Sequence, residues 1–214
     1  SRLHLVMLES NQNILAAAVH GDDAIILTCD VQSVLNTYIT GGFTPVPANE
    51  FDFCSSVFYP TEDGTVLGPK IGRVLGKTFY SMHPFTEGGH VAWLRGVCLS
   101  LRNTASYIPI LRVLVPKLLQ LCGVGKVWRE NTFDYKSVAS KPHTVCEETW
   151  TLMEERYKMS EFQVLSLESE IQGLQLGDVL SGDRWLAFVI RDIAGSDTYD
   201  DWLATSVADG NVGD

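Results

Sequence analysis

The segment "ILAAAVHGDDAIILTC", Ile14 to Cys29, places two apolar runs on either side of a Gly-Asp-Asp tripeptide. Short apolar, β-branched runs around a glycine-containing turn predict a β-hairpin, with strands at Ile14 to Val19 and Ala24 to Cys29. Because the apolarity is nearly continuous, we expect both faces of these strands to be covered. Adjacent aspartates at a turn repel each other, and a divalent cation can offset that repulsion. The alternative is a turn selected for its backbone alone, with no metal.

The sequence after this hairpin predicts a mixed α+β chain. Residues 31–40 have apolar positions at helical spacing and stop at two glycines. Residues 51–59 predict a second hairpin whose turn lies at Pro60 to Gly64. Pro69 suits the first turn of a helix that points Ile71, Val74, Leu75 and Phe79 inward. Further helices are expected at 89–102, 107–121, 147–158 and 160–172, the last with a capping box of Ser160 and Gln163.

The net charge of −10 is unevenly distributed. Residues 64–140 carry ten Lys and Arg against three acidic residues, whereas residues 141–214 carry five against fifteen. Lys70, Arg73 and Lys77 recur at spacings of three and four and so share one face of the predicted helix; we call them the basic stripe. A polyanion could bind the middle segment, although an ordinary solvated basic face is the alternative.

Length and composition set the broad class. The 214 residues, 45% of them hydrophobic, can form one good-sized core or two small ones. There is neither an apolar run of about 18 residues nor a signal-peptide pattern, so we expect a soluble intracellular protein without a membrane span. The five cysteines are at least 24 residues apart. We therefore expect reduced, mostly buried thiols, and no zinc site at His143 and Cys146, which lack a second ligand pair.

The order of these features resembles the RNA-dependent RNA polymerases of positive-strand RNA viruses, from motif C onward. "HGDDAIIL" (residues 20–27) resembles motif C, and residues 31–42 with the following loop resemble motif D. "FDFCSSVFYP" (51–60) resembles the primer-grip motif E, and "LGPKIGRVLGKTFY" (67–80) the first thumb helix. The resemblance covers about half the chain, residues 14–122. It implies the carboxyl-terminal part of a palm at 1–66, a mainly helical thumb at 67–172, and an acidic C-terminal extension at 173–214.

The resemblance also implies an activity. It is nucleotidyl transfer onto an RNA 3′-hydroxyl by a two-metal mechanism, with Mg²⁺ or Mn²⁺ as cofactor. Asp22 becomes the main metal ligand and Asp23 a weaker contributor. The implied partners are template and product RNA and nucleoside triphosphates, in a replication complex of the host cytoplasm; the triphosphate-binding residues stay unassigned. The implied RNA contacts are Cys54 and Ser55 near the primer 3′ end, and Lys70, Arg73 and Lys77 on product phosphates.

Several parts of the family pattern are missing. The twenty residues before Gly21 are too few for motif A, motif B and the basic fingers motif, so the resemblance implies that an upstream region or a separate chain carries them. Residues 24–68 contain no Lys, Arg or His, which leaves the motif D proton donor unassigned. Asp192 to Asp197 match the D-x4-D form of motif A. A permuted motif order is thus an alternative, although the acidic surroundings argue against it.

Two other functions stay open. One is a non-catalytic RNA-binding or assembly subunit that keeps a polymerase-like thumb. The other is a metal-dependent phosphohydrolase using Asp22, Asp23 and His20, although such enzymes use more clustered ligands than this chain's scattered histidines offer. In the polymerase interpretation, the uncovered edge beside residues 14–19 predicts that the isolated chain associates.

Overall fold

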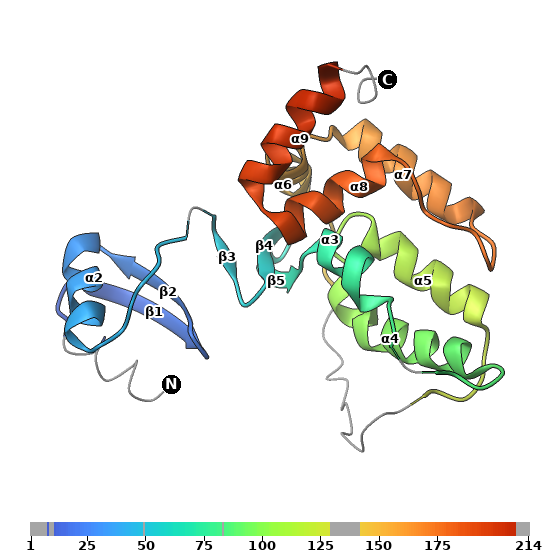
Figure 1. Ribbon diagram of the computed structural model, residues 1–214, viewed down its shortest axis with the longest axis horizontal. Helices are drawn as coiled ribbons and strands as arrows, with labels where there is room; N and C mark the ends of the chain where they lie inside the picture. The colour runs from blue at the N-terminus through green and yellow to red at the C-terminus, as the bar shows by residue number, and fades with distance from the viewer. Residues whose placement is uncertain (1–7, 9–10, 49, 83, 129–141, 209–214) are drawn as a thin grey trace. The chain divides into compact units, whose positions relative to one another are not determined.

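The computed structural model describes residues 8, 11–48, 50–82, 84–128 and 142–208 (Figure 1). The predicted α+β class is confirmed, since helices accompany two small antiparallel sheets within these residues. Internal contacts divide the chain into two compact units, residues 1–57 and 58–214. Each unit is described by itself, and the palm and thumb assignments of their segments remain predictions.

The first unit begins with the predicted hairpin. Strand β1 (Ile14–His20) pairs antiparallel with β2 (Asp23–Thr28), and α2 (Val31–Thr40) follows. Of the two residues in the turn, Gly21 has a φ of 65°, whereas Asp22 does not have a positive φ. That combination is typical of a type II′ turn, whose first position favours glycine. The predicted strands are confirmed to within one residue at each end, and the predicted helix is confirmed.

Helix α2 covers one face of the β1–β2 hairpin (Figure 1). The side chains between them form the core of this unit: Leu8, Val34 and Tyr38, packed against Ile14, Val19, Ile26 and Phe43. On the sheet's other face, Leu15 is 68% exposed and Leu27 is 60% exposed. Within the first unit the expectation of cover on both faces is therefore wrong, because no other described element of this unit lies over these two leucines.

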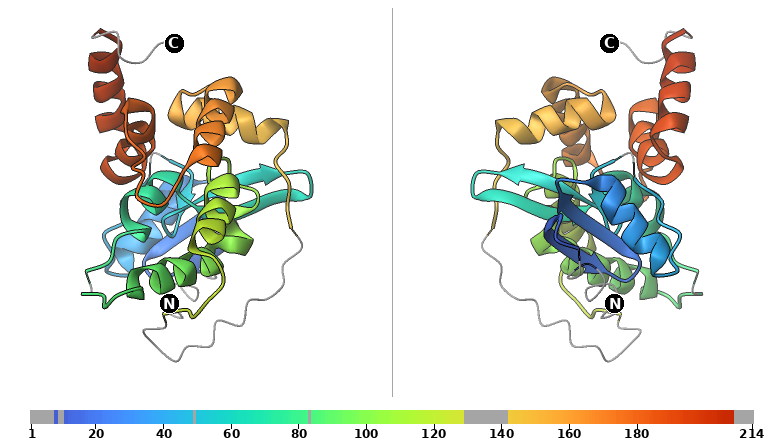
Figure 2. Two further views of the ribbon diagram at one scale, coloured as in Figure 1. Left: turned by 90° about the vertical axis from the view of Figure 1, so that its right-hand side faces the viewer. Right: turned by 90° about the vertical axis from the view of Figure 1, so that its left-hand side faces the viewer.

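The second predicted hairpin contains two turns. Strand β3 (Asp52–Phe53) pairs antiparallel with the start of β4 (Ser56–Thr61), and the chain reverses at Cys54 and Ser55. A second reversal leads into β5 (Gly64–Pro69), which runs beside β4 as a ribbon (Figure 2). The predicted turn at residues 60–64 is thus the second reversal, and the sequence interpretation missed the first one. The boundary between the units falls inside β4, after Val57.

The second unit is mainly helical. Its helices are α3 (Ile71–Arg73) and its π-helical continuation η1 (Val74–Thr78), α4 (Gly89–Ala105), α5 (Leu111–Cys122), α6 (Glu147–Tyr157), α7 (Glu161–Gly173), α8 (Asp183–Val189) with its π-helical continuation η2 (Ile190–Ala194), and α9 (Ser196–Ala208). The capping box of Ser160 and Gln163 is confirmed at the start of α7. Pro69, expected inside a helix, instead ends β5. Among the described helices, none has the length and apolarity needed to cross a membrane.

The segment after residue 172 belongs to the core of this unit. Trp185 and Phe188 of α8 and Tyr199 of α9 are buried, and α8 packs against α3. Residues 183–208 of the predicted acidic extension therefore form helices whose apolar side chains pack inside this unit. Most acidic residues of this segment are exposed, on helices whose opposite faces are apolar and buried. The acidic composition therefore concealed the fact that the segment packs into the core.

The cysteines follow the sequence expectation only in part. All five are free thiols, but only Cys98 and Cys122 are buried, while Cys29 is exposed. Burial, with a smaller contribution from Cys122, raises the pKa of the Cys98 thiol to about 12.

Candidate functional site

The turns of the two hairpins in the first unit meet. The backbone N–H of Cys54 donates a 2.9 Å hydrogen bond to Oδ2 of Asp23. Asp22 is close enough for its charge to act on the Cys54 thiol. Three residues predicted for the site thus come together from segments about 30 residues apart, and Ser55 follows Cys54 in the same turn.

The Cys54–Ser55 turn has an unusual backbone. Cys54 has a φ of 52° and Ser55 a φ of 60°, so both lie in the left-handed region. A two-residue hairpin turn with this conformation normally contains Asn or Gly, and each other L-residue costs roughly 1–2 kcal/mol. Backbone strain of this kind is concentrated at functional sites and is sustained by surrounding contacts. Here one such contact is the hydrogen bond to Asp23.

The site is electrostatically negative. Loss of hydration raises the pKa of the Cys54 thiol, and the charges of Asp23 and Asp22 raise that pKa further. The thiol is therefore protonated at neutral pH and is not an activated nucleophile. Asp23 is committed to the Cys54 N–H, whereas Asp22 has no hydrogen bond or ion pair with any other residue that the structure describes.

The carboxylates at the β1–β2 turn provide some, but not all, of the oxygen ligands that a hard cation such as Mg²⁺ requires. Mg²⁺ is usually held by one or two protein carboxylates together with substrate phosphates and waters, and Asp22 and Asp23 supply two carboxylates. Within the described residues, no group of three or more His, Cys, Asp and Glu side chains could hold a metal ion. Asp22 and Asp23 therefore supply only part of the ligand set that a Mg²⁺ site needs.

The basic stripe lies in the second unit, around the short helix formed by α3 and η1. Lys70 is the residue before α3, Arg73 ends α3, and Lys77 lies in η1. Ile71 and Val74 are buried on the inner face and Lys77 is exposed, as the periodicity predicts. Lys70 and Arg73, expected to be exposed like Lys77, are half-buried. Leu75 and Phe79, also expected to point inward, are only half-buried.

Two other basic residues of segment 64–140 form contacts inside the fold that their spacing in the sequence did not predict. Arg95 is buried, and its guanidinium donates to three carbonyls at and beyond the end of α5, those of Cys122, Gly123 and Lys126. Arg112 forms two 2.8 Å hydrogen bonds with the carboxylate of Glu168. The net charge of this segment therefore overstates the charge available to a ligand.

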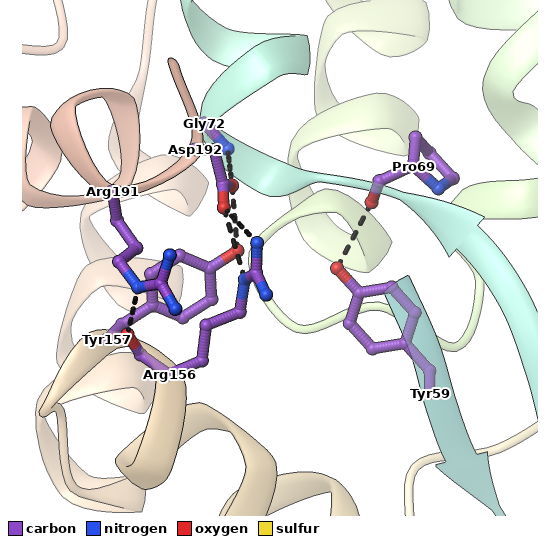
Figure 3. A network of polar contacts seen from close by, with 7 residues as sticks. All are labelled: Tyr59, Pro69, Gly72, Arg156, Tyr157, Arg191 and Asp192. Carbon is purple, nitrogen blue, oxygen red and sulfur yellow. Dashed lines mark hydrogen bonds and ion pairs between the residues drawn. The ribbon is translucent and has the colours of Figure 1, made fainter. Parts of the chain in front are cut away.

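Asp192 lies at the centre of a buried network (Figure 3). Its side chain is 0% exposed. Oδ1 accepts hydrogen bonds from Nε and Nη2 of Arg156, and Oδ2 accepts from the Gly72 N–H at 2.7 Å and the Tyr157 hydroxyl at 2.8 Å. Both oxygens are fully engaged within the core, while Asp197 is exposed on α9. The interpretation of this pair as a displaced motif A is therefore wrong.

Comparison of the chain with models of protein families, with curated proteins and with solved structures found no match. Any assignment to the viral polymerases is therefore a proposal that starts from the sequence motifs alone.

Proposed function

We propose that this chain is the carboxyl-terminal palm and thumb portion of a viral RNA-directed RNA polymerase. The observation that carries the proposal is the contact between Asp23 and the Cys54 N–H. It sets the Gly-Asp-Asp turn against the turn of the β3–β4 hairpin, two segments that the resemblance assigns to metal binding and to the primer 3′ end.

The two aspartates take different roles. Asp23 holds the strained Cys54–Ser55 turn, so one of its carboxylate oxygens is already occupied. Asp22, exposed on the turn, is the residue available to hold Mg²⁺ or Mn²⁺. When bound, such an ion lowers the barrier to attack by the RNA 3′-hydroxyl and stabilises the leaving pyrophosphate.

The site is completed from outside these residues. Two-metal phosphoryl transfer needs at least one further carboxylate and a basic group for the triphosphate, which the resemblance places in motifs A, B and the fingers. The apolar face of β1 and β2, with Leu15 and Leu27 exposed, is available to pack against the polypeptide that carries them. Catalysis is therefore a property of the complete complex.

The experiment is Asp22→Asn in the complete polymerase complex, with primer-extension activity and RNA affinity measured separately. Losing the anionic ligand is expected to reduce RNA synthesis by about 100-fold, equivalent to about 2.7 kcal/mol of barrier, with RNA affinity unchanged. Glu87→Gln is the matched control, since Glu87 is an exposed carboxylate elsewhere in the chain. Near wild-type synthesis by the Asp22 variant would refute the assignment.

The second candidate is a non-catalytic RNA-binding or assembly subunit. It is favoured by the fact that the basic stripe lies in a compact unit with its own core, separate from the acidic turn. Its signature would be salt-sensitive RNA binding by the chain, together with no partner that supplies an aspartate-rich strand and a basic fingers region.

A further inference from the structure

The helix that carries the basic stripe is packed closely on the C-terminal helices. A Cβ atom at Gly72 would lie 1.7 Å from the carbonyl oxygen of Phe188, and a Cβ at Gly76 would lie 2.8 Å from Cδ1 of Ile193. Glycine at these two positions therefore allows the backbone of α3 and η1 to approach α8 and η2 closely. We call α8 and η2, against which α3 and η1 pack, the seat.

The chain is fixed on both sides of Lys70. The hydroxyl of Tyr59, whose residue is fully buried, donates a 3.1 Å hydrogen bond to the carbonyl of Pro69. Two residues after Lys70, the Gly72 N–H donates to Asp192 of the seat. Figure 3 shows these two anchors on either side of the start of the helix. The backbone position of Lys70 is thus determined by a strand and by the C-terminal segment together.

Asp192 is itself held rigidly. Arg156 and Tyr157, both from the end of α6, donate to the same carboxylate that accepts from Gly72. Both helices at this contact have π-helical continuations, η1 in one and η2 in the other. Such segments are rare and occur frequently at functional sites.

We propose that Asp192 is a positioning residue that holds the basic stripe in the orientation needed to bind nucleic-acid phosphates, with α8 and η2 as the seat. The inference depends on the proposed RNA contact of Lys70, Arg73 and Lys77. Residues 71–78 are too few to form a stable helix alone, so the spacing of the three cations is set by what the helix packs against. The C-terminal acidic segment thereby gains a role in RNA binding without touching RNA.

The test uses the full chain and a fluorescein-labelled RNA primer–template, with affinity measured by anisotropy over a series of salt concentrations. Asp192→Asn is the main variant. Asparagine keeps the shape of aspartate but has only one acceptor oxygen. We expect that oxygen to accept from the buried Arg156 guanidinium. The Gly72 N–H then faces the NH₂ group of the asparagine, which is a donor and cannot accept its hydrogen bond. Tyr157→Phe is the matched control, because it removes a hydrogen bond to the same carboxylate but leaves the Gly72 bond intact.

Each phosphate contact contributes about 0.9 to the slope of log affinity against log salt. Replacing Lys70, Arg73 and Lys77 together with Gln is expected to reduce that slope by about 2 to 3. Asp192→Asn is expected to reduce it by about 1 or more, with no further loss when combined with the triple variant, whereas Tyr157→Phe leaves it unchanged. Because the slope counts phosphate contacts, a modest loss of stability in a folded protein does not change it.

The outcomes separate this inference from the proposed RNA contact. A reduced slope for the triple variant with a normal slope for Asp192→Asn overturns the positioning role and leaves the RNA contact standing. An unchanged slope for the triple variant overturns both. If Asp192→Asn does not fold, Gly76→Leu replaces it and leaves every charge in place. A Cβ at Gly76 would already lie 2.8 Å from Cδ1 of Ile193 and 3.1 Å from Cγ1 of Val189, so a side chain as large as leucine has to displace the helix from α8 and η2. A wild-type slope for Gly76→Leu would then count against the seat.

Discussion

Gly72→Ala is expected to destabilise the folded protein, because the structure leaves no room for a Cβ atom at this position. The added methyl group would lie 1.7 Å from the carbonyl oxygen of Phe188, 2.4 Å from its carbonyl carbon, and 2.9 Å from Cβ of Asp192. The first two atoms are backbone, so no rotamer change can relieve the overlap. To reach even a tight 3.0 Å contact with that oxygen, α3 and α8 must separate by 1.3 Å.

The expected cost has two parts. Overpacking a core by one methyl group typically costs about 1–3 kcal/mol, and this overlap is with backbone. Separation also weakens the bond from the Gly72 N–H to the Asp192 carboxylate, and hydrogen bonds to charged groups contribute about 1.5–3 kcal/mol. The total is about 3 kcal/mol or more, which for a chain of this size lowers the melting temperature by about 6 to 12 °C.

The assay is thermal and urea denaturation followed by circular dichroism, with Gly173→Ala as the control. Gly173 lies at the end of α7, and a Cβ there would have no atom within 4 Å. That substitution should be neutral or stabilise the protein by up to about 1 kcal/mol, because alanine reduces the entropy of the unfolded chain. A Gly72→Ala protein that melts within about 2 °C of wild type would refute the packing argument.

Two further predictions concern alkaline pH and solubility. Burial raises the pKa of Tyr199 to about 12, so the unfolded chain loses this proton near pH 10 while the folded protein keeps it. The free energy of unfolding should therefore fall between about pH 10 and pH 12, and less steeply in Tyr199→Phe; equal slopes in urea titrations would contradict this. The exposed leucines of the β1–β2 face should make the isolated chain associate, so Leu15→Lys with Leu27→Lys should raise the monomer fraction in light scattering. Val46→Lys, which changes an 85% exposed residue outside the strands, should not, and an equal gain there would point to net charge alone.

The sequence predicted the local elements well where one pattern dominates. Apolar runs on either side of Gly21 predicted the β1–β2 hairpin, because glycine readily adopts the positive φ that the turn requires. Helical spacing and the glycine stop predicted α2, and Ser160 with Gln163 predicted the start of α7. These features depend on neighbours within a few residues, which a sequence displays directly.

The Cys54–Ser55 turn could not be predicted in this way. Neither residue favours the left-handed region, and the sequence offers a stronger turn signal at residues 60–64. A contact with Asp23, about 30 residues earlier in the chain, helps to hold the turn. The position of one candidate site residue therefore depends on long-range contact rather than on local propensity.

By itself, the sequence determined which chemical groups are present: the paired carboxylates at a hairpin turn, the basic stripe, and the acidic C-terminal residues. Only the tertiary structure decided what each group does within the fold. Asp23 accepts a hydrogen bond from a strained turn, and Arg95 donates to carbonyls at the end of α5. Asp192 of η2 accepts from α3 and from α6 inside the core. The physical reason is that a charge costs little in water and several kcal/mol when buried without partners, so its role depends on packing that no local pattern encodes.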